Sequence, residues 1–378
     1  MTLFRTCKKF GFLLSLPLLF LAASTNAEPL RPPAVPLVAC DPYFSVWSGA
    51  DHLTDVDTMH WTGKPQHLTS LVRIDGQTYR VMGATPASVA ALQQTSLEVR
   101  PTRTIYTFAG AGIQLTLTFM NGDLPGDLDQ LSRPVTYLTW QAQSTDGQKH
   151  KVSVYFDASS ELAVNNPDQA VTFQKADAAG VKAWKVGTVD QPVLAQKGDD
   201  VRIDWGYFYV AFPGSETANL TADTAQNVRT SFINNGTLPA PSDEASLQNN
   251  NRNDSVIAFA SDLGAVGSKP ASSWLMLAYD DLYSIQYMKH NLRPYWRRNG
   301  WQASDLLQAA ARDYASLQTR CPQFDRELIR DLRRAGGDDY AELGALAYRQ
   351  CFAAGKFVAD DNGQPMFFCK ENHSNGCI

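Results

Sequence analysis

The best local candidate for acid–base chemistry is an adjacent carboxylate and amide near the end of the chain, Glu371 and Asn372. The two residues follow the apolar run "PMFFC" and precede Asn375-Gly376, a pair that is typical of a turn. Loops at such places project side chains from a rigid framework. We therefore predict that Glu371 is a general acid or base and that Asn372 holds a substrate amide. The alternative is that both residues cap or brace the turn.

Charged and aromatic residues are mixed in two further strings, "AYDDLYS" and "NLRPYWRRNG". Neighbouring residues of a strand point to opposite faces, so only one of Asp280 and Asp281 could face a site. The guanidinium groups of Arg293, Arg297 and Arg298 could clamp a substrate carboxylate through paired hydrogen bonds. We predict from these two strings that Asp280 and Arg297 bind substrate. The alternatives are an aspartate that caps the following segment and arginines that form salt bridges between domains.

Familiar catalytic signatures are missing from the sequence. It contains no Ser-x-x-Lys arrangement, no G-x-S-x-G elbow, no H-E-x-x-H motif and no phosphate-binding loop. The cysteine spacing matches no zinc site, and His60 and Trp61 stand too isolated to indicate a metal. Asp41, Tyr43 and Trp47 in "CDPYFSVWS" could line a pocket, although packing in a core is the favoured interpretation. We predict no metal and no cofactor, so amide hydrolysis would need an activated water or an unfamiliar nucleophile.

The first 27 residues have the pattern of a secretory signal peptide. Three basic residues precede an apolar run from Phe10 to Ala23, and Thr25 and Ala27 suit a cleavage site. The apolar run is too short to span a membrane. We predict cleavage after Ala27 and a secreted or periplasmic protein without a membrane span. A lipoprotein-like box ends at Cys40, but it lies too far beyond the apolar run for us to expect lipid attachment.

The composition of the chain excludes some classes of partner. The net charge is −5 at pH 7, and it becomes more negative once the basic signal peptide is removed. No basic run is mixed with aromatic residues, so nucleic acid is not an expected partner. The remaining length of about 350 residues is enough for two or three domains. Of the six cysteines, Cys7 leaves with the signal peptide, and the odd number left implies a free thiol or a missing partner.

The residues from 28 to about 280 have the pattern of successive β-hairpins. Turn signals at Asp75-Gly76, at Gly110 with Gly112, and at Asp146-Gly147 each separate two runs of alternating apolar residues. The string "VTFQKADAAGVKAWKVGT" predicts a fourth hairpin. Consecutive hairpins of this kind predict a large antiparallel β-sandwich. The stretch 235–253 is rich in Asn, Pro and Ser and predicts a long loop.

The hydrophobic period changes after about residue 300. Apolar residues three and four apart predict a helix capped by Ser304, a second helix over about 324–335, and a third helix capped by Asp338. The pair Gly336-Gly337 would end the second helix, and "DDNG" would turn the chain into the short strand "PMFFC". Three helices cannot close a core by themselves. We expect them to lie on the sandwich or to begin a larger helical domain.

Several aromatic-rich strings occur along the chain. They include "LRPPAVPLVACDPYFSVWS", "LTDVDTMHWTGKPQHLTSLVRIDGQTYRVMG", "LAYDDLYSIQYMKHNLRPYWRRNG" and "AYRQCFAAGKFVADDNGQPMFFCKENHSNGCI". In their residues and their order they resemble the exported glutaminase A family of fungi and bacteria. The resemblance runs from about Leu30 to the last residue. It implies an N-terminal β-sandwich followed by an (α/α)6 toroid of the six-hairpin glycosidase type, in a chain that continues past "SNGC". It carries over no established catalytic residues.

The resemblance also implies a domain order and an activity. The expected segments are a signal peptide (1–27), an N-terminal β segment (28–95), the sandwich domain (96–300) and an incomplete helical domain (301–378). The expected enzyme is a hydrolase that converts L-glutamine and water to L-glutamate and ammonia, and we expect the polypeptide up to Ile378 to be inactive alone. Two alternatives stay open: a six-hairpin glycoside hydrolase and a non-catalytic carbohydrate-binding sandwich protein. The expected partner is a small molecule, either glutamine or a glycan.

Overall fold

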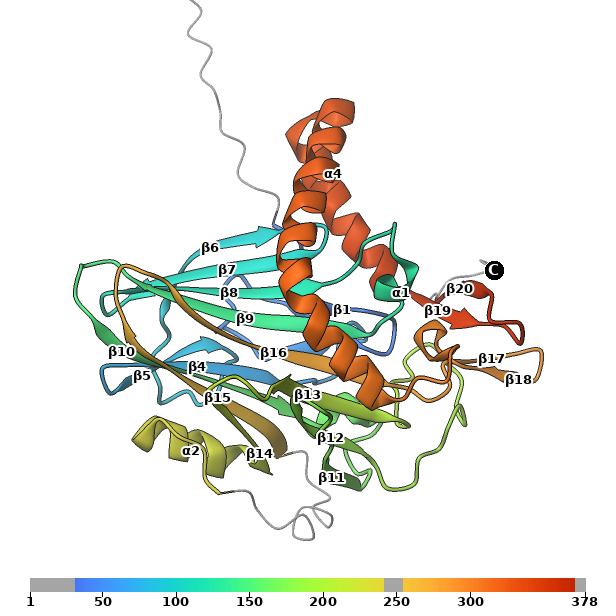
Figure 1. The fold of residues 1–378 in the computed structure, drawn as a ribbon, viewed down its shortest axis with the longest axis horizontal. Helices are drawn as coiled ribbons and strands as arrows, with labels where there is room; N and C mark the ends of the chain where they lie inside the picture. The colour runs from blue at the N-terminus through green and yellow to red at the C-terminus, as the bar shows by residue number, and fades with distance from the viewer. Residues whose placement is uncertain (1–30, 241–253, 371–378) are drawn as a thin grey trace, which may run out of the picture.

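Two large antiparallel sheets form the body of the protein, seen in a computed structural model that describes residues 31–240 and 254–370 (Figure 1). The smaller sheet contains, in spatial order, β14 (Ala218–Thr224), β15 (Ser255–Val266), β10 (His150–Ser159), β4 (Leu68–Ile74) and β5 (Gln77–Met82). The larger sheet contains, in spatial order, β11 (Val171–Lys175), β12 (Val181–Thr188), β13 (Tyr207–Pro213), β16 (Ala271–Asp280), β9 (Val135–Ser144), β8 (Ile113–Asn121), β7 (Arg103–Gly110) and β6 (Gln93–Val99).

Shorter elements surround these sheets. One small sheet consists of β1 (Val35–Ala39), β2 (Ser45–Ser48) and β3 (Met59–His60). Two hairpins are formed by β17 (Ile285–Tyr287) with β18 (His290–Leu292), and by β19 (Gly355–Ala359) with β20 (Pro365–Cys369). The α-helices are α1 (Leu128–Leu131), α2 (Ala225–Asn235) and α4 (Ala303–Ala353), and short 3₁₀ turns occupy Ser160–Ala163 and Tyr295–Arg297.

The two large sheets pack face to face around one apolar core. Trp140 on β9 is fully buried, and its ring stacks on Phe259 of β15 with the centroids 5.9 Å apart. Phe156 of β10 lies 6.0 Å away on the same side. The indole N–H of Trp140 donates to the Ser70 hydroxyl at 3.1 Å, which satisfies its buried polar atom. These contacts join β9 of one sheet to β4, β10 and β15 of the other, so the predicted antiparallel sandwich is confirmed.

Three of the four predicted hairpins are confirmed. β4 pairs with β5, β7 with β8, and β11 with β12. The two turn residues Asp75 and Gly76 have φ angles of 48° and 91°, and Ala111 and Gly112 have φ angles of 49° and 73°. Two consecutive positive φ angles are typical of the tight turns whose twist matches that of the flanking strands. Glycine at the second position lowers the cost of this conformation.

The predicted hairpin around Asp146-Gly147 is wrong. β9 pairs with β8 and β16 in the larger sheet, whereas β10 pairs with β4 and β15 in the smaller sheet. The turn reverses the chain, as its residues indicate, but it carries the chain from one sheet to the other. A turn signal is local and does not determine whether the two strands pair. The partner of each strand depends on which apolar face it can bury.

α2 was not predicted, and it covers the outer face of the smaller sheet (Figure 1). Arg229 of α2 binds both carboxylate oxygens of the fully buried Asp157 on β10, at 2.7 and 2.9 Å. The helix ends at Gly236, whose φ angle of 75° suits a left-handed cap. The predicted loop over 235–253 therefore begins with the end of a helix, and its residues 241–253 lie outside the described part of the chain.

α4 consists of two antiparallel arms that meet at Gly337, where φ is 86° and ψ is −171° (Figure 1). The predicted end of a helix at Gly336-Gly337 is therefore confirmed. The prediction of a separate break before residue 324 is wrong, because the first arm runs without interruption through Pro322. Proline removes one helical hydrogen bond, but Leu317 and Cys321 are fully buried against the sheet on the same turns. Packing of this face outweighs the local preference for a break.

The start of α4 also differs from the prediction. The helix begins at Ala303, and Gln302 is the cap in place of Ser304. The carboxylate of Asp305 accepts a hydrogen bond from the backbone N–H of Gln302 at 2.8 Å. An acidic side chain at the third helical position commonly pairs with the cap in this way. The observed cap lies two residues before the predicted one, and the apolar face of the helix is unchanged.

The first arm of α4 packs across the outer face of the larger sheet. Tyr314 stacks on Trp274 of β16 with ring centroids 3.6 Å apart, and its hydroxyl lies 2.7 Å from that of Thr139 on β9. The Tyr137 hydroxyl donates to the backbone carbonyl of Ala310 at 3.0 Å. This arm therefore lies on the sandwich, which is one of the two arrangements expected for the helical residues. The arrangement brings the second arm, and the β19–β20 hairpin after it, back towards one end of the sandwich (Figure 1).

The turns at one edge of the sandwich are joined by His150. Its Nδ1 lies 2.6 Å from Asp75 Oδ2, and its Nε2 lies 3.1 Å from Asp146 Oδ1. Hydrogen bonds to Asp75 and then to Asp146 raise the pKa of His150 above 6.5. The stabilisation is therefore complete below about pH 6.5 and is lost as the pH rises through the higher pKa of the folded state. Because the pKa of both aspartates is lowered, the same contacts also weaken in acid below 3.8.

We predict that His150→Gln removes the part of the stability decline that begins near pH 6.5 and continues as the pH rises through the raised pKa of His150 in the folded state. Urea-unfolding midpoints of parent and variant should differ most near pH 6 and converge as the pH rises. The matched control is His290→Gln at an exposed position on β18, which removes a histidine but leaves the contacts of His150 with Asp75 and Asp146 in place. A constant difference between parent and His150→Gln across the range would contradict the prediction.

Candidate functional site

The two residues predicted to do acid–base and amide-binding chemistry, Glu371 and Asn372, lie outside the described residues. The residue before them, Lys370, is the last one described, and it lines two adjoining cavities. Its backbone N–H donates to the Ala354 carbonyl at 2.8 Å, and its ammonium donates to the Gly198 carbonyl at 3.0 Å. Lys370 therefore stands at a fixed place between the end of α4 and a loop of the sandwich.

We call the two cavities together the Lys370 cleft. The larger one, of about 520 Å³, is lined by Tyr43, by loop residues 194–198 and Val201, and by Ile285, Gln286 and Lys370. The smaller one, of about 230 Å³, is lined by Pro42, Ser45, Trp47, Trp61, Gln350, Ala353, Ala354 and Lys370. Clefts that combine aromatic walls with a few polar groups are the usual form of small-molecule sites. The cleft lies where three parts of the chain meet: the turn before β2, the sandwich loops, and the end of α4 with β20.

Asp41 organises the turn that forms one wall of the cleft. Its Oδ1 accepts hydrogen bonds from the backbone N–H groups of Tyr43 and Phe44, both at 2.9 Å. Aspartate commonly fixes a turn through such bonds to the backbone two and three residues on. The carbonyl of Pro42 in the same turn accepts from the indole N–H of Trp61 at 2.8 Å. The turn and Trp61 are thus held together as one wall.

His60 is a structural residue next to this wall. Its Nε2 lies 3.0 Å from the Pro42 carbonyl, which can only accept, so Nε2 carries the proton. The backbone N–H of Thr62 faces Nδ1 at 3.3 Å. Burial lowers the pKa of His60 to about 4, so the ring is neutral at pH 7. Among the described residues no group of three or more His, Cys, Asp or Glu side chains is arranged to hold a metal ion.

Tyr43 faces the larger cavity and packs on a buried tryptophan. Its ring meets Trp205 edge-on with the centroids 5.4 Å apart. The indole N–H of Trp205 donates to the carbonyls of Asp281 and Tyr283 at 2.8 and 2.9 Å. Burial, followed by the charges of Asp41 and Asp281, raises the pKa of Tyr43 to about 12. The Tyr43 hydroxyl therefore keeps its proton at neutral pH and can act as a hydrogen-bond donor.

A buried ammonium group, that of Lys356, contacts the Asp41 carboxylate that organises the turn. Lys356 Nζ on β19 donates to Asp41 Oδ2 at 2.5 Å and lies 3.0 Å from Asp281 Oδ2. The second contact is an ion pair without hydrogen-bond geometry. Side-chain exposure is only 6% for Lys356, 3% for Asp41 and 2% for Asp281. Burial opposes the charge on Lys356, but the carboxylates of Asp281 and Asp41 outweigh it and raise its pKa.

The predicted substrate-binding residues Asp280 and Arg297 are bound to each other. Arg297 Nε and Nη2 donate to the two oxygens of Asp280 at 2.9 and 2.5 Å, and both residues are buried. Asp280 Oδ1 also accepts from the backbone N–H of Leu282 at 3.2 Å. Asp280 therefore holds the turn that follows it, and Arg297 forms a salt bridge, but with a residue of the same predicted domain (96–300) and not between domains. Arg297 also lines a separate cavity of about 450 Å³ with Arg293 and Arg298, and a substrate contact there stays a prediction.

The two adjacent aspartates face different surroundings, although only Asp280 belongs to β16 and Asp281 lies just beyond its end. Asp280 pairs with Arg297, whereas Asp281 faces Lys356. Burial raises the pKa of Asp281, and the neighbouring Lys356 opposes this shift. Asp281 is the member of the pair that lies near the Lys370 cleft, because its backbone carbonyl holds Trp205 behind Tyr43. The other member, Asp280, is the one predicted to bind substrate.

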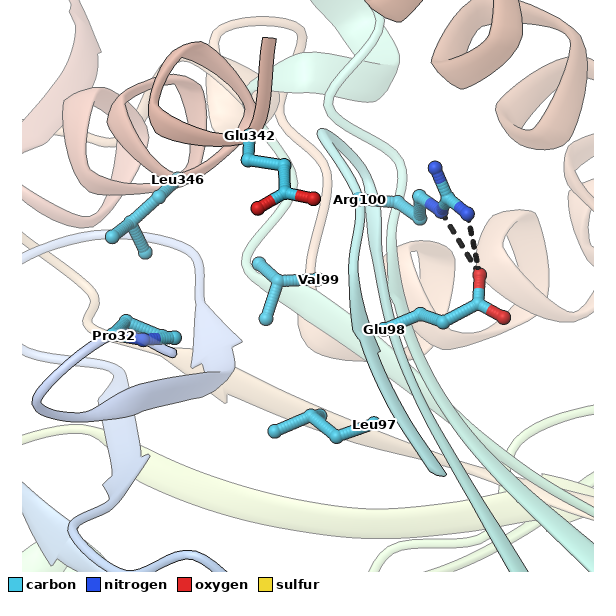
Figure 2. Close-up of a pocket in the computed structure, with 7 residues that line it drawn as sticks. All are labelled: Pro32, Leu97, Glu98, Val99, Arg100, Glu342 and Leu346. Carbon is cyan, nitrogen blue, oxygen red and sulfur yellow. Dashed lines mark hydrogen bonds and ion pairs between the residues drawn. The ribbon is translucent and has the colours of Figure 1, made fainter. Parts of the chain in front are cut away.

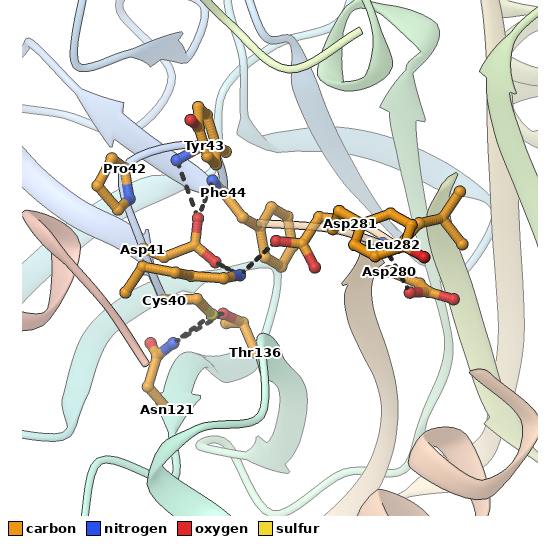
Figure 3. A network of polar contacts seen from close by, with 12 residues as sticks. Cys40, Asp41, Pro42, Tyr43, Phe44, Asn121, Thr136, Asp280, Asp281 and Leu282 are labelled. Atoms are coloured by element: carbon orange, nitrogen blue, oxygen red, sulfur yellow. Dashed lines mark hydrogen bonds and ion pairs between the residues drawn. The ribbon is translucent and has the colours of Figure 1, made fainter. Parts of the chain in front are cut away.

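The half-buried Cys40, next to Asp41, is not an activated nucleophile. Cys40 Sγ lies 3.4 Å from the Thr136 hydroxyl and accepts from Asn121 Nδ2 at 3.1 Å (Figure 3). Burial strongly raises the pKa of the Cys40 thiol, and the nearby charge of Asp123 adds to the effect. A raised pKa removes the thiolate that nucleophilic chemistry needs. The cysteines at 40, 321, 351 and 369 are all free thiols.

A further cavity of about 230 Å³ lies away from these residues, between β6 and the second arm of α4 (Figure 2). Its walls are Pro32, Leu97, Glu98, Val99, Arg100, Glu342 and Leu346. Arg100 and Glu98 pair at 2.6 Å on its rim. It shares no lining residue with the Lys370 cleft and contains none of the predicted site residues. We therefore take the Lys370 cleft as the candidate site.

Sequence reasoning missed Lys356 and Trp205 and only partly identified the wall of the cleft. Asp41, Tyr43 and Trp47 were noted as possible pocket residues, and the structure bears out this possibility for Tyr43 and Trp47. A lysine in the strand "GKFVA" normally points to solvent, so nothing local marks Lys356 as buried. Its role depends on two carboxylates that lie 315 and 75 residues away in the chain.

Three family models match successive parts of the chain. A domain of unknown function (DUF4964) matches residues 19–94, and a second (DUF5127) matches residues 102–331, which is more than half of the chain. The glutaminase A six helical-hairpin domain matches residues 337–378. The Lys370 cleft is lined by residues from all three matched segments.

Two curated fungal proteins are similar to almost the whole chain. Glutaminase A of Aspergillus oryzae is 28% identical over 94% of this chain and 53% of its own length. A protein of Arthroderma benhamiae described as "Probable glutaminase" is 20% identical over 94% of this chain and 44% of its own length. The chain thus spans about half the length of the curated relatives it matches.

Similarity to solved structures is much weaker. A protein described as a kojibiose phosphorylase from the human microbiome gives a TM-score of 0.32 at 7% identity, over 83% of this chain and 31% of that chain. Heparan sulfate lyase HepC from Pedobacter heparinus gives a TM-score of 0.26 at 8% identity, over 50% of this chain and 22% of that chain. Neither likeness supports an argument about function. Among the residues that the structure describes, no helix has the length and apolar character that crossing a membrane requires.

Proposed function

We propose, on the premise that this chain belongs to the glutaminase A family, that the whole protein hydrolyses L-glutamine to L-glutamate and ammonia. The supporting observation is the similarity to a curated glutaminase A over 94% of the chain. Since the chain spans about half of that relative, the activity is proposed for the whole protein. We further propose that the protein is exported after cleavage behind Ala27.

Hydrolysis of a side-chain amide needs three things from the site. A base must take a proton from the attacking water, a donor must stabilise the oxyanion, and an acid must protonate the leaving ammonia. We propose Glu371 as the base and acid, because it follows Lys370 at the cleft and no activated thiol or histidine lines the described walls. Tyr43 is the proposed neutral donor, since its raised pKa keeps the hydroxyl protonated.

Lys370 is the proposed partner of the substrate carboxylate. One N–H of its ammonium is used by the Gly198 carbonyl, and a lysine ammonium has two more to donate. Burial lowers the pKa of Lys370, and the charges of Asp199 and Asp200 act against this shift. Asn372, the predicted holder of the substrate amide, keeps that proposed role.

Ammonia release by the full-length protein tests this function directly. We expect steady release from L-glutamine and no release of reducing sugar from a panel of glycans, because the amide is the proposed reacting group. Turnover of a glycan without ammonia release would favour a six-hairpin glycoside hydrolase. Binding of a glycan without turnover of either substrate would favour a non-catalytic carbohydrate-binding protein, and both of these outcomes would overturn the proposal.

A further inference from the structure

We propose that Lys356 is a positioning residue that ties the walls of the Lys370 cleft together through its two carboxylate partners. The expected effect of Lys356 on turnover rests on the proposed function, whereas its expected effect on the local stability of the cleft walls does not. Lys356 lies in the segment matched by the six helical-hairpin model, Asp41 in the segment matched by DUF4964, and Asp281 in the segment matched by DUF5127. One ammonium group therefore contacts carboxylates from two other segments that are far apart in the sequence.

The first branch of this connection reaches the turn before β2. Lys356 binds Oδ2 of Asp41, while Oδ1 of the same carboxylate accepts the N–H groups of Tyr43 and Phe44. The Pro42 carbonyl in that turn orients Trp61. A displacement of the Asp41 carboxylate would therefore move Tyr43 in the larger cavity and Trp61 in the smaller one.

The second branch reaches Trp205, which packs against the Tyr43 ring. Asp281 faces Lys356 with its side chain and accepts the indole N–H of Trp205 with its backbone carbonyl. Trp205 in turn packs edge-on against the Tyr43 ring. Both branches thus converge on Tyr43, one through its backbone and the other through its ring.

The third branch is the backbone of β19 itself. Lys356 pairs with Phe368 in the β19–β20 ladder, and the neighbouring pair joins Gly355 to Cys369. Lys370 follows directly and bonds to the Ala354 carbonyl. The ion pairs of Lys356 with Asp41 and Asp281 therefore also fix β20, the strand that Lys370 follows.

Removal of the ammonium would leave two carboxylates buried without a cation between them. A buried ionised carboxylate without a partner is strongly unfavourable, so it either takes up a proton or moves towards water. Two carboxylates that share one site also repel each other. In either case Asp41 Oδ2 loses its ion pair with Lys356, so the turn and the β19–β20 hairpin lose their common anchor.

The experiment compares Lys356→Met with Arg229→Met in the full-length protein. Methionine keeps a long apolar side chain and removes the charge. Arg229 is the matched control, because it also pairs with a buried aspartate, but it does so on α2 and β10 and not at the cleft. Amide hydrogen exchange measures local opening in each variant.

We expect Lys356→Met to speed amide exchange about tenfold or more in residues 41–47 and 355–370, because both lose their anchor. Arg229→Met should speed exchange around α2 and leave these two segments unchanged. In the ammonia assay, Lys356→Met should lower kcat by about 10- to 100-fold through misplaced groups. Arg229→Met should keep kcat at a comparable loss of thermal stability.

A second variant keeps the test valid if Lys356→Met does not fold. The double variant Lys356→Met/Asp281→Asn retains the buried net charge of the parent, one negative unit, while it removes the cation that joins the segments. It should also show faster exchange in both segments. Unchanged exchange in either segment, or equal acceleration there by Arg229→Met, would overturn the positioning role. A parent protein without glutaminase activity would instead refute the proposed function, and the exchange comparison would still decide the role of Lys356.

Discussion

Glu371→Gln in the full-length protein should lower the turnover of glutamine by about 100-fold or more while the protein stays folded. The glutamine side chain introduced at position 371 has nearly the size of the glutamate side chain that it replaces. Its amide cannot take a proton from water or return one to ammonia at neutral pH. The described part of the cleft offers no obvious substitute, since Tyr43 keeps its proton and Lys370 is a cation. The loss should appear in kcat, because the substitution removes a proton-transfer group and keeps a polar side chain of similar shape.

The matched control for this prediction is Glu327→Gln. Glu327 is an exposed residue on the first arm of α4, where it accepts a hydrogen bond from Gln323 at 2.9 Å. Its change to Gln should leave both kcat and thermal stability unaltered. Equal activity of Glu371→Gln and the parent would return Glu371 to a turn-bracing role. A large loss of thermal stability alongside the loss of activity would also indicate that Glu371 braces the turn.

Breaking the buried Asp280–Arg297 pair should have the largest effect on stability. We expect Arg297→Met to lower the free energy of unfolding by about 3–5 kcal/mol, because it leaves Asp280 ionised and without its cation in the interior. Urea denaturation of the full-length protein measures the loss. Replacing both partners by apolar residues, as Asp280→Leu/Arg297→Met, should cost much less than the single change, since no buried charge then remains.

Arg298→Met is the matched control for the buried pair. Arg298 pairs with Asp129, whose side chain is 58% exposed, so this pair should contribute only about 0–1 kcal/mol. A loss at Arg297 no greater than the loss at Arg298 would contradict the prediction. An increase in KM for glutamine with Arg297→Met, beyond what its instability explains, would support the predicted substrate contact of Arg297.

The local conformation of this protein is well encoded in short stretches of sequence. The pair Asp75-Gly76 predicts a hairpin because it tolerates two positive φ angles, and the structure has them. Gly337 predicts the end of a helical arm for the same reason, since its φ angle of 86° is costly for other residues. The strings that resemble the glutaminase A family likewise lie within single segments.

Strand pairing and helix continuity that depend on residues distant in the sequence could not be predicted from short stretches. The turn at Asp146-Gly147 looks like a hairpin turn, but the two strands belong to different sheets. Pro322 looks like a helix end, but the burial of Leu317 and Cys321 holds the helix together. In both cases the free energy gained by packing against another layer of the fold outweighs the local conformational preference.

The sequence by itself determined most of the strands, the two helical arms near its end, the positions of most turns and the family to which the chain belongs, but not α2. Only the tertiary structure decided that Lys356 lies between Asp41 and Asp281, and that the end of β20 borders a cleft lined by Tyr43 and Trp61. The physical reason is that a turn or a helix depends on neighbours along the chain, whereas the burial and pairing of a charge depend on neighbours in space.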